Sequence, residues 1–126
     1  MTEPCDLSAV AARALIGSKK LSARELLDSC IRRMDAIDPA VNAMVARDDE
    51  KARQDAAKAD EATARGDALG PLHGLPIGIK DLENTAGLRT TYGSALYRDF
   101  VPKEDQLIVA SVRKAGAIIA GKTTTP

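Results

Sequence analysis

Lys80 is the last residue of an apolar run in which few other side chains could take part in a reaction. The run Leu75–Lys80 contains proline and glycine and is typical of a short buried strand. Because side chains alternate along a strand, Lys80 shares its face with Pro76 and Gly78, which leave open space beside the amine. We expect that amine to be drawn out of water. Burial lowers the pKa of a lysine, and a neutral lysine can serve as a general base.

A structural interpretation of Lys80 stays open beside the catalytic one. A lysine at a strand end commonly extends its amine to solvent or pairs with an acid, and Asp81 is adjacent. His73 is the single histidine of the chain, and one histidine cannot build a metal site without acidic or thiol partners. We expect His73 to be a turn residue that bonds to backbone. The sequence predicts no metal and no cofactor.

The run Gly70–Asp81 reads Gly-Pro-Leu-His-Gly-Leu-Pro-Ile-Gly-Ile-Lys-Asp and resembles the lysine motif of the amidase signature family. The resemblance is loose from Leu21 and tight from Gly70 onward, so it covers most of the chain. It continues through three ordered blocks, which are Ala86–Ser94, Val101–Asp105 and Ala115–Pro126.

This resemblance implies a hydrolase of small-molecule carboxamides that works through a Ser–Ser–Lys triad. One serine is the nucleophile, a second serine in a cis peptide relays the proton, and the lysine is the terminal base. Carried over to this chain, the base is Lys80, because a serine hydroxyl attacks poorly until a base takes its proton. The implied fold is α/β, with N-terminal helices followed by part of a central mixed sheet.

The chain departs from the family at the serines. The family places them in a Gly/Ser-rich segment after the block that ends at Pro126, and no Gly-Ser-Ser-Gly run occurs here. The serines present have local explanations, such as a helix cap at Ser22, and Ser94 lies in a turn without an assigned role. We expect residues 1–126 to be the N-terminal fragment of a single larger amidase domain, inactive alone. Its helical part is predicted for about residues 1–69, and the lysine motif and first core strands for about residues 70–126.

Composition argues against several classes of partner. The chain has 18 basic and 18 acidic residues and no basic block, which argues against nucleic acid. No apolar stretch is long enough for a bilayer, and the polar N-terminus is unlike a signal peptide. Cys5 and Cys30 lack metal-ligand spacing and are expected to be free thiols, so we expect a cytoplasmic protein without membrane contacts.

Hydrophobic spacing predicts helices before strands. Ser22 and Glu25 form a capping box that starts the second helix, and Asp38-Pro39 is expected to stop it. The first helix should bury a stripe that contains Leu7 and Val10. A strand or extended link is expected at Val41–Ala46, followed by a helix at about Asp49–Arg65 with a Glu61–Arg65 pair and Gly66 as its cap. After the lysine motif we expect a structured loop at Asn84–Tyr97 that contains up to one helical turn. A helix capped by Asp105 should then run to Lys114, and a strand should follow at Ala117–Gly121.

Two alternative functions stay open. Gly116–Thr123 matches the P-loop pattern Gly-x4-Gly-Lys-Thr of nucleotide-binding proteins, although its isoleucines favour a strand and the expected helix lies before the pattern rather than after it. The other alternative is a non-catalytic remnant that associates with other chains. The predicted strands at Leu75–Ile79 and Ala117–Ala120 would leave edges and apolar side chains exposed. We therefore expect a homo-oligomer or association through sheet edges.

Overall fold

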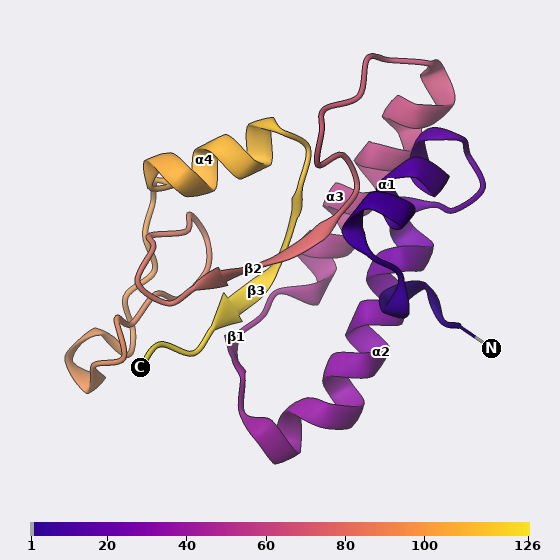
Figure 1. The fold of residues 1–126 in the computed structure, drawn as a ribbon. Coiled ribbons are helices and arrows are strands. Elements are labelled where there is room, and N and C mark those ends of the chain that lie inside the picture. Colours follow the sequence, from indigo (N-terminus) through magenta and orange to yellow (C-terminus); the bar gives the residue numbers. More distant parts are fainter. Residues whose placement is uncertain (1) are drawn as a thin grey trace.

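A computed structural model describes residues 2–126, which form helices around a small sheet (Figure 1). The helices precede most of the sheet, which confirms the predicted α/β class. Along the chain the elements are η1 (Pro4–Asp6), α1 (Ala9–Gly17), α2 (Ala23–Val41), β1 (Met44–Ala46), α3 (Asp49–Arg65), β2 (Pro76–Lys80), η2 (Ala95–Tyr97), α4 (Leu107–Lys114) and β3 (Ile118–Thr123).

The sheet is mixed and has the strand order β1-β3-β2. Strand β3 runs antiparallel to β1 and parallel to β2, and the connection from β2 to β3 passes through α4. The first strand therefore comes from the helical part of the chain. The pairing of β2 with β3 contains an irregularity, because Ile77 lies opposite Ile119 while the next residue, Gly78, lies opposite Gly121. One residue of β3 is thus left unpaired, as in a β-bulge.

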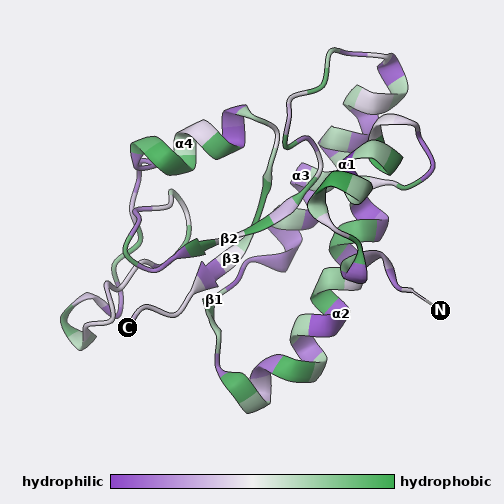
Figure 2. Ribbon diagram, viewed as in Figure 1, coloured by the Kyte–Doolittle hydropathy of each residue, from purple (hydrophilic) through white to green (hydrophobic). Residues whose placement is uncertain are grey.

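Helices cover both faces of this sheet. Ile118 packs with Leu27 of α2 and Ala56 of α3, whereas Ile119 packs with Val109 of α4 on the other face. Figure 2 shows apolar and polar residues alternating around α2, as a helix that covers one face requires. The expectation that two apolar strands would lie exposed is wrong for β3, which the flanking helices bury except at Thr123, whereas in β2 only Ile79 is buried. Within residues 2–126, the outer edges of β1 and β2 have no strand partner.

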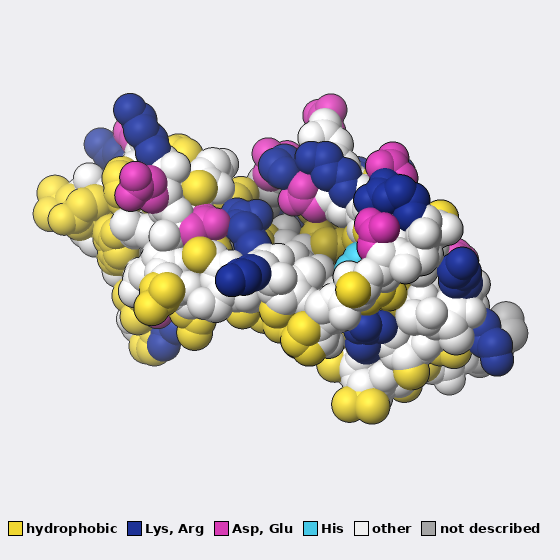
Figure 3. Space-filling model, turned by 90° about the horizontal axis from the view of Figure 1, so that it is seen from above, with side chains coloured by type: hydrophobic (Ala, Val, Ile, Leu, Met, Phe, Trp, Pro, Cys, Tyr) yellow, Lys and Arg dark blue, Asp and Glu magenta, His cyan; other side chains and the backbone are white. Residues whose placement is uncertain are grey.

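Six of the ten large apolar side chains that are exposed in residues 2–126 lie around η2 and at the start of α4. Leu96 is 92% exposed and Leu107 is 81% exposed. Figure 3 shows hydrophobic side chains gathered at the end of the molecule that carries the η2 loop. The other members of this set are Tyr97, Phe100, Val101 and Ile108.

The helix starts were predicted better than the packing of α1. The capping box of Ser22 and Glu25 is present at the start of α2 and confirms that prediction. The stripe predicted for the first helix is wrong, because Ala12 and Ile16 are buried and Val10 is 83% exposed. The buried face is the one that meets Leu26 of α2.

The end of α2 differs from the prediction. Helix α2 continues through Pro39 to Val41, and the Asp38 carboxylate accepts hydrogen bonds from the backbone of Ala43 and Met44 beyond its end. Pro39 lies in the last turn, where its missing donor removes only one bond. None of the helices described in residues 2–126 has both the length and the hydrophobicity that crossing a bilayer requires.

The side-chain partners of residues in and near α3 and α4 also differ from the prediction. The bounds of α3 and its left-handed Gly66 are as predicted, but Arg65 pairs with Asp67, at 2.9 Å, instead of Glu61. Asp105 does not cap α4, which begins after Gln106. Its carboxylate instead accepts bonds from the Ala86 backbone and from Arg113, and so ties the loop after β2 to the end of α4.

Candidate active site at the end of strand β2

Lys80 is the last residue of β2 and is exposed. Its position on the face shared with Gly78 is as predicted, since both are exposed while Ile79 between them is buried. The prediction that its amine is drawn out of water is wrong for this chain. The reason is that β2 is an edge strand whose Lys80 side chain lies on an exposed face. Asp81 does not pair with Lys80, because the Asp81 carboxylate points into the loop that follows.

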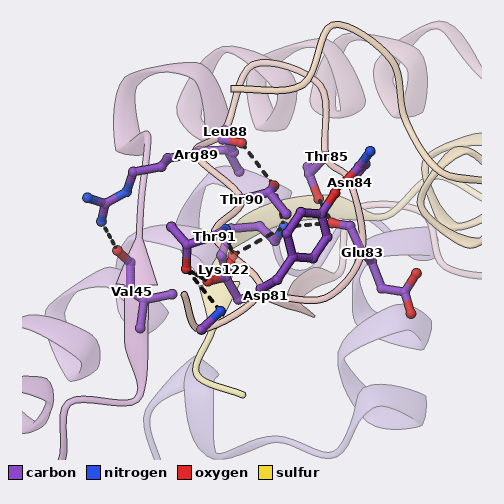
Figure 4. A network of polar contacts seen from close by, with 12 residues as sticks. Val45, Asp81, Glu83, Asn84, Thr85, Leu88, Arg89, Thr90, Thr91 and Lys122 are labelled. Carbon is purple, nitrogen blue, oxygen red and sulfur yellow. Dashed lines mark hydrogen bonds and ion pairs between the residues drawn. The ribbon is translucent and has the colours of Figure 1, made fainter. Parts of the chain in front are cut away.

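The buried lysine of this region is Lys122 on β3, a residue to which the sequence assigned no site role. Its side chain is 0% exposed. The ammonium donates hydrogen bonds to the Glu83 carbonyl at 2.7 Å and to Thr90 Oγ1 at 2.8 Å, and Asp81 Oδ1 lies at 3.8 Å (Figure 4). Burial lowers the pKa of the Lys122 ammonium, and the charges of Asp81 and Glu83 oppose that shift.

The loop after β2 is folded around these groups. The Asp81 carboxylate accepts hydrogen bonds from the Thr91 backbone at 3.0 Å and from the Thr91 hydroxyl. The Tyr92 backbone N–H donates to the Asp81 carbonyl at 2.9 Å, and the Tyr92 hydroxyl donates to Asn84. The loop therefore leaves β2 at Asp81 and returns to the same residue ten positions later. Asp81 and Thr90 are buried at 2% and 0% exposure, unusually deep for a polar loop.

The P-loop pattern at Gly116–Thr123 does not form a phosphate-binding loop. Its last six residues are strand β3, and a P-loop needs a loop whose backbone N–H groups point at a phosphate. Lys122, which would reach the phosphates, is buried beneath the β2 loop. The alternative of a nucleotide-binding protein is therefore contradicted by the backbone.

His73 lies in a buried turn and has a structural environment. Its Nε2 lies 3.0 Å from the Ala59 carbonyl and 3.0 Å from Thr63 Oγ1, both on α3. The side chain is 7% exposed. The prediction of a turn residue bonded to backbone is confirmed.

The six serines all make hydrogen bonds with backbone groups. Ser22 caps α2, and Ser94 accepts a bond from the Leu96 backbone at the start of η2. The Ser29 hydroxyl is buried and accepts a bond from the Cys5 backbone. The other three contact the backbone of their own helices, and they are Ser8, Ser18 and Ser111. None of these bonds joins a serine to Lys80.

Within residues 2–126, a close group of three potential metal ligands occurs at one place, the N-terminal turn. Ligand atoms of Glu3, Cys5 and Asp6 lie within 4.8 Å of one another. Both carboxylates already pair with Arg33, at 3.2 Å and 2.9 Å, so the cluster is accounted for as an ion-pair network. Cys30 lies nearby in an apolar setting, where burial raises the pKa of its thiol.

Comparison with known proteins identifies the family. The family model described as Amidase matches residues 25–126, which is most of the chain. The chain belongs to this family, the amidase signature family. Its small mixed sheet with flanking helices is one part of that α/β fold.

Relatives include both a hydrolase and a component of a transamidating enzyme. The chain is 40% identical over 120 residues to an acylamidase from Rhodococcus erythropolis, a match that covers 95% of this chain and 25% of the relative. It is also 40% identical over 118 residues to a glutamyl-tRNA(Gln) amidotransferase subunit from Synechococcus sp. (strain CC9605), with 94% and 24% covered. The chain therefore spans about a quarter of the length of these curated relatives.

Solved structures give the same result. A bacterial aryl acylamidase of the amidase signature family superposes with a TM-score of 0.88 at 27% identity, over 95% of this chain and 25% of that one. The peptide amidase from Stenotrophomonas maltophilia superposes with a TM-score of 0.87 at 30% identity, over 94% and 24%. The chain thus has the backbone of the corresponding quarter of an amidase.

Proposed function

We propose that this chain supplies the general base of an amide hydrolase, and that Lys80 is that base. The observation that carries the proposal is the place of Lys80, at the end of β2 inside the motif that resembles the family's lysine motif. The proposed reaction is hydrolysis of a carboxamide C–N bond. A nucleophilic serine attacks the carbonyl, and its proton passes through the second serine to the Lys80 amine.

Two features of the site support this role. Lys80 is exposed on the face that it shares with Gly78 and Thr123, so its amine is accessible to a second group from outside residues 2–126. The serines of the triad would come from the part of the amidase fold that residues 1–126 do not contain. That part would also cover Lys80, and removal from water favours the neutral amine that a base requires.

The proposal is tested by completing the fold. We expect a chimaera that joins this chain to the region of the Rhodococcus erythropolis acylamidase beyond the 25% matched here to hydrolyse a chromogenic aryl amide. The acylamidase itself is the positive control. A folded chimaera without hydrolysis would contradict the proposal that this chain carries a working base.

The free 126-residue chain is expected to lack amidase activity. Each of its serines is held by a bond to backbone, and a base without a nucleophile performs no acyl transfer. Mass spectrometry after incubation with an activated ester should therefore show no acylated serine. An acyl group on the chain that disappears in the Ser94→Ala variant would overturn this and make Ser94 the nucleophile.

We also propose that the free chain self-associates through the exposed apolar residues around η2 and the start of α4. Leu96 and Leu107 are the most exposed of these, and burying such side chains is favourable by about 25 cal/mol per Å². Light scattering should show oligomers that the double variant Leu96→Ser, Leu107→Ser converts to monomers. The Val10→Ser variant, at an 83% exposed site on α1, is the matched control. A monomeric wild-type chain would contradict this proposal.

The proposed setting is the reducing cytoplasm. Cys5 and Cys30 are both free in the structure, as expected for a protein kept reduced.

A further inference from the structure

The buried ammonium of Lys122 has no part in the function proposed above, and yet it is the largest side chain fully buried in residues 2–126. A charge inside a protein of this size needs partners, and Lys122 finds them in the loop after β2. It bonds to the Glu83 carbonyl and the Thr90 hydroxyl, with the Asp81 carboxylate at 3.8 Å. All three partners belong to the segment Asp81–Thr91, which begins directly after Lys80.

The irregular pairing of β2 with β3 places Lys122 there. Ile79 lies opposite Lys122, and Ile77 lies opposite Ile119, so these four side chains share the α4 face of the sheet. Without the unpaired residue in β3, alternation would put Ile119 and Lys122 on opposite faces. Lys80, opposite Thr123, lies on the other face. The two lysines are thus neighbours in the sheet that point to opposite sides.

We propose that Lys122 is a positioning residue for Lys80, because its ammonium fastens the segment Asp81–Thr91 to β3 and thereby fixes the end of β2 (Figure 4). Lys122 touches neither substrate nor reacting atoms in this role. The effect of Lys122 on catalysis rests on the proposed function of Lys80. The effect of Lys122 on the order of the segment Asp81–Thr91 does not depend on that proposal.

The contacts show why the ammonium is needed. The Asp81 backbone N–H donates to the Thr123 carbonyl at 2.9 Å, so the ladder between β2 and β3 extends one residue past Lys80. The segment then turns away, and Lys122 bonds it back to β3 at Glu83 and Thr90, while Asp105 and the Phe100 carbonyl hold it from the other side. A neutral apolar side chain at this place would remove this donor from the buried Thr90 hydroxyl and from the Glu83 carbonyl, which would keep the bond from the Thr85 hydroxyl.

Hydrogen exchange on the 126-residue chain tests the fixing of the segment. In the Lys122→Met variant we expect amides of residues 80–92 to exchange at least about tenfold faster, while those of α2 and α3 change much less. The Lys114→Met variant, at an exposed lysine of α4, should leave both regions unchanged. Equal acceleration everywhere would overturn the proposal, since Lys122 would then only stabilise the whole fold. Unchanged exchange in residues 80–92 would also overturn it.

A matched pair of side chains separates the charge from the space that Lys122 fills. In a Cys5→Ser, Cys30→Ala background, a Lys122→Cys variant is alkylated while unfolded, with 2-bromoethylamine or with 1-bromopropane, and then refolded. The two products have the same length and differ in the terminal ammonium. The aminoethyl product should restore slow exchange in residues 80–92, and the propyl product should not. Equal restoration by both would show that Lys122 acts only by filling space.

The effect of Lys122 on catalysis is measured in the acylamidase chimaera. Lys122→Met should lower kcat by about tenfold or more with little change in KM, since a small misplacement of a catalytic group costs rate rather than binding. An unchanged kcat would overturn the positioning role. If Lys80→Ala leaves hydrolysis intact while Lys122→Met still loosens residues 80–92, the assignment of Lys80 is wrong and the fixing of the segment stands.

Discussion

Replacing Lys80 by alanine is expected to lower amide hydrolysis in the acylamidase chimaera by at least about 10²-fold, the scale of losing a positioned general base. The loss should fall on kcat, because the amine accepts a proton during the reaction and does not hold the substrate. Steady-state kinetics with an aryl amide give the measurement. Lys58→Ala, at an exposed lysine of α3, is the matched control and should keep wild-type rates.

Replacing Lys80 by arginine distinguishes a role as a general base from a role as a fixed positive charge. Arginine keeps the positive charge on a slightly longer side chain but stays protonated throughout the working pH range, so it cannot accept the proton. We therefore expect Lys80→Arg to be as inactive as Lys80→Ala. An arginine variant with near wild-type turnover would mean that Lys80 supplies only charge, and wild-type turnover in the alanine variant would remove it from the mechanism.

Local signals in the sequence were sufficient for most helices. The capping box at Ser22 and Glu25 and the glycine after Arg65 act within one turn of chain, so their effect does not depend on distant residues. Side-chain partners were harder, because they depend on which elements meet. Asp105 looked like a cap for α4 but instead bonds to Arg113 and to the loop after β2.

In the candidate site, too, the features set by nearby residues were predicted and those set by distant contacts were not. The motif identified Lys80 and its face of β2, whereas its burial was misjudged, because the apolar run does not show that β2 is an edge strand of this sheet. Lys122 was missed for a different reason. A single unpaired residue in β3 decides which face Lys122 occupies, and bulges have no reliable signal in one sequence. The strand-forming isoleucines before it did show correctly that the P-loop pattern would not be a loop.

Gly116, the first glycine of that P-loop pattern, has a structural role that predicts a large effect. It follows α4 with φ +100°, and the bonds from Gly116 N–H to the Arg113 carbonyl and from Ala117 N–H to the Val112 carbonyl close the helix. A Cβ at Gly116 would lie 2.7 Å from the backbone Cα of His73. We expect Gly116→Ala to lower the free energy of unfolding by about 3 kcal/mol or more, from backbone strain and the clash together.

The matched control is Gly66, which ends α3 with φ +78° and the same two kinds of hydrogen bond. A Cβ there would meet no atom within 4 Å, so Gly66→Ala should cost only the strain of the left-handed backbone, about 1–2 kcal/mol. Urea unfolding of both variants and the wild-type chain, followed by circular dichroism, measures the difference. If the two alanine variants lose equal stability, the close approach of Gly116 to His73 contributes nothing. If Gly116→Ala costs clearly more, the contact between the lysine motif and the end of α4 is what requires this glycine, and nucleotide binding need not be invoked to explain it.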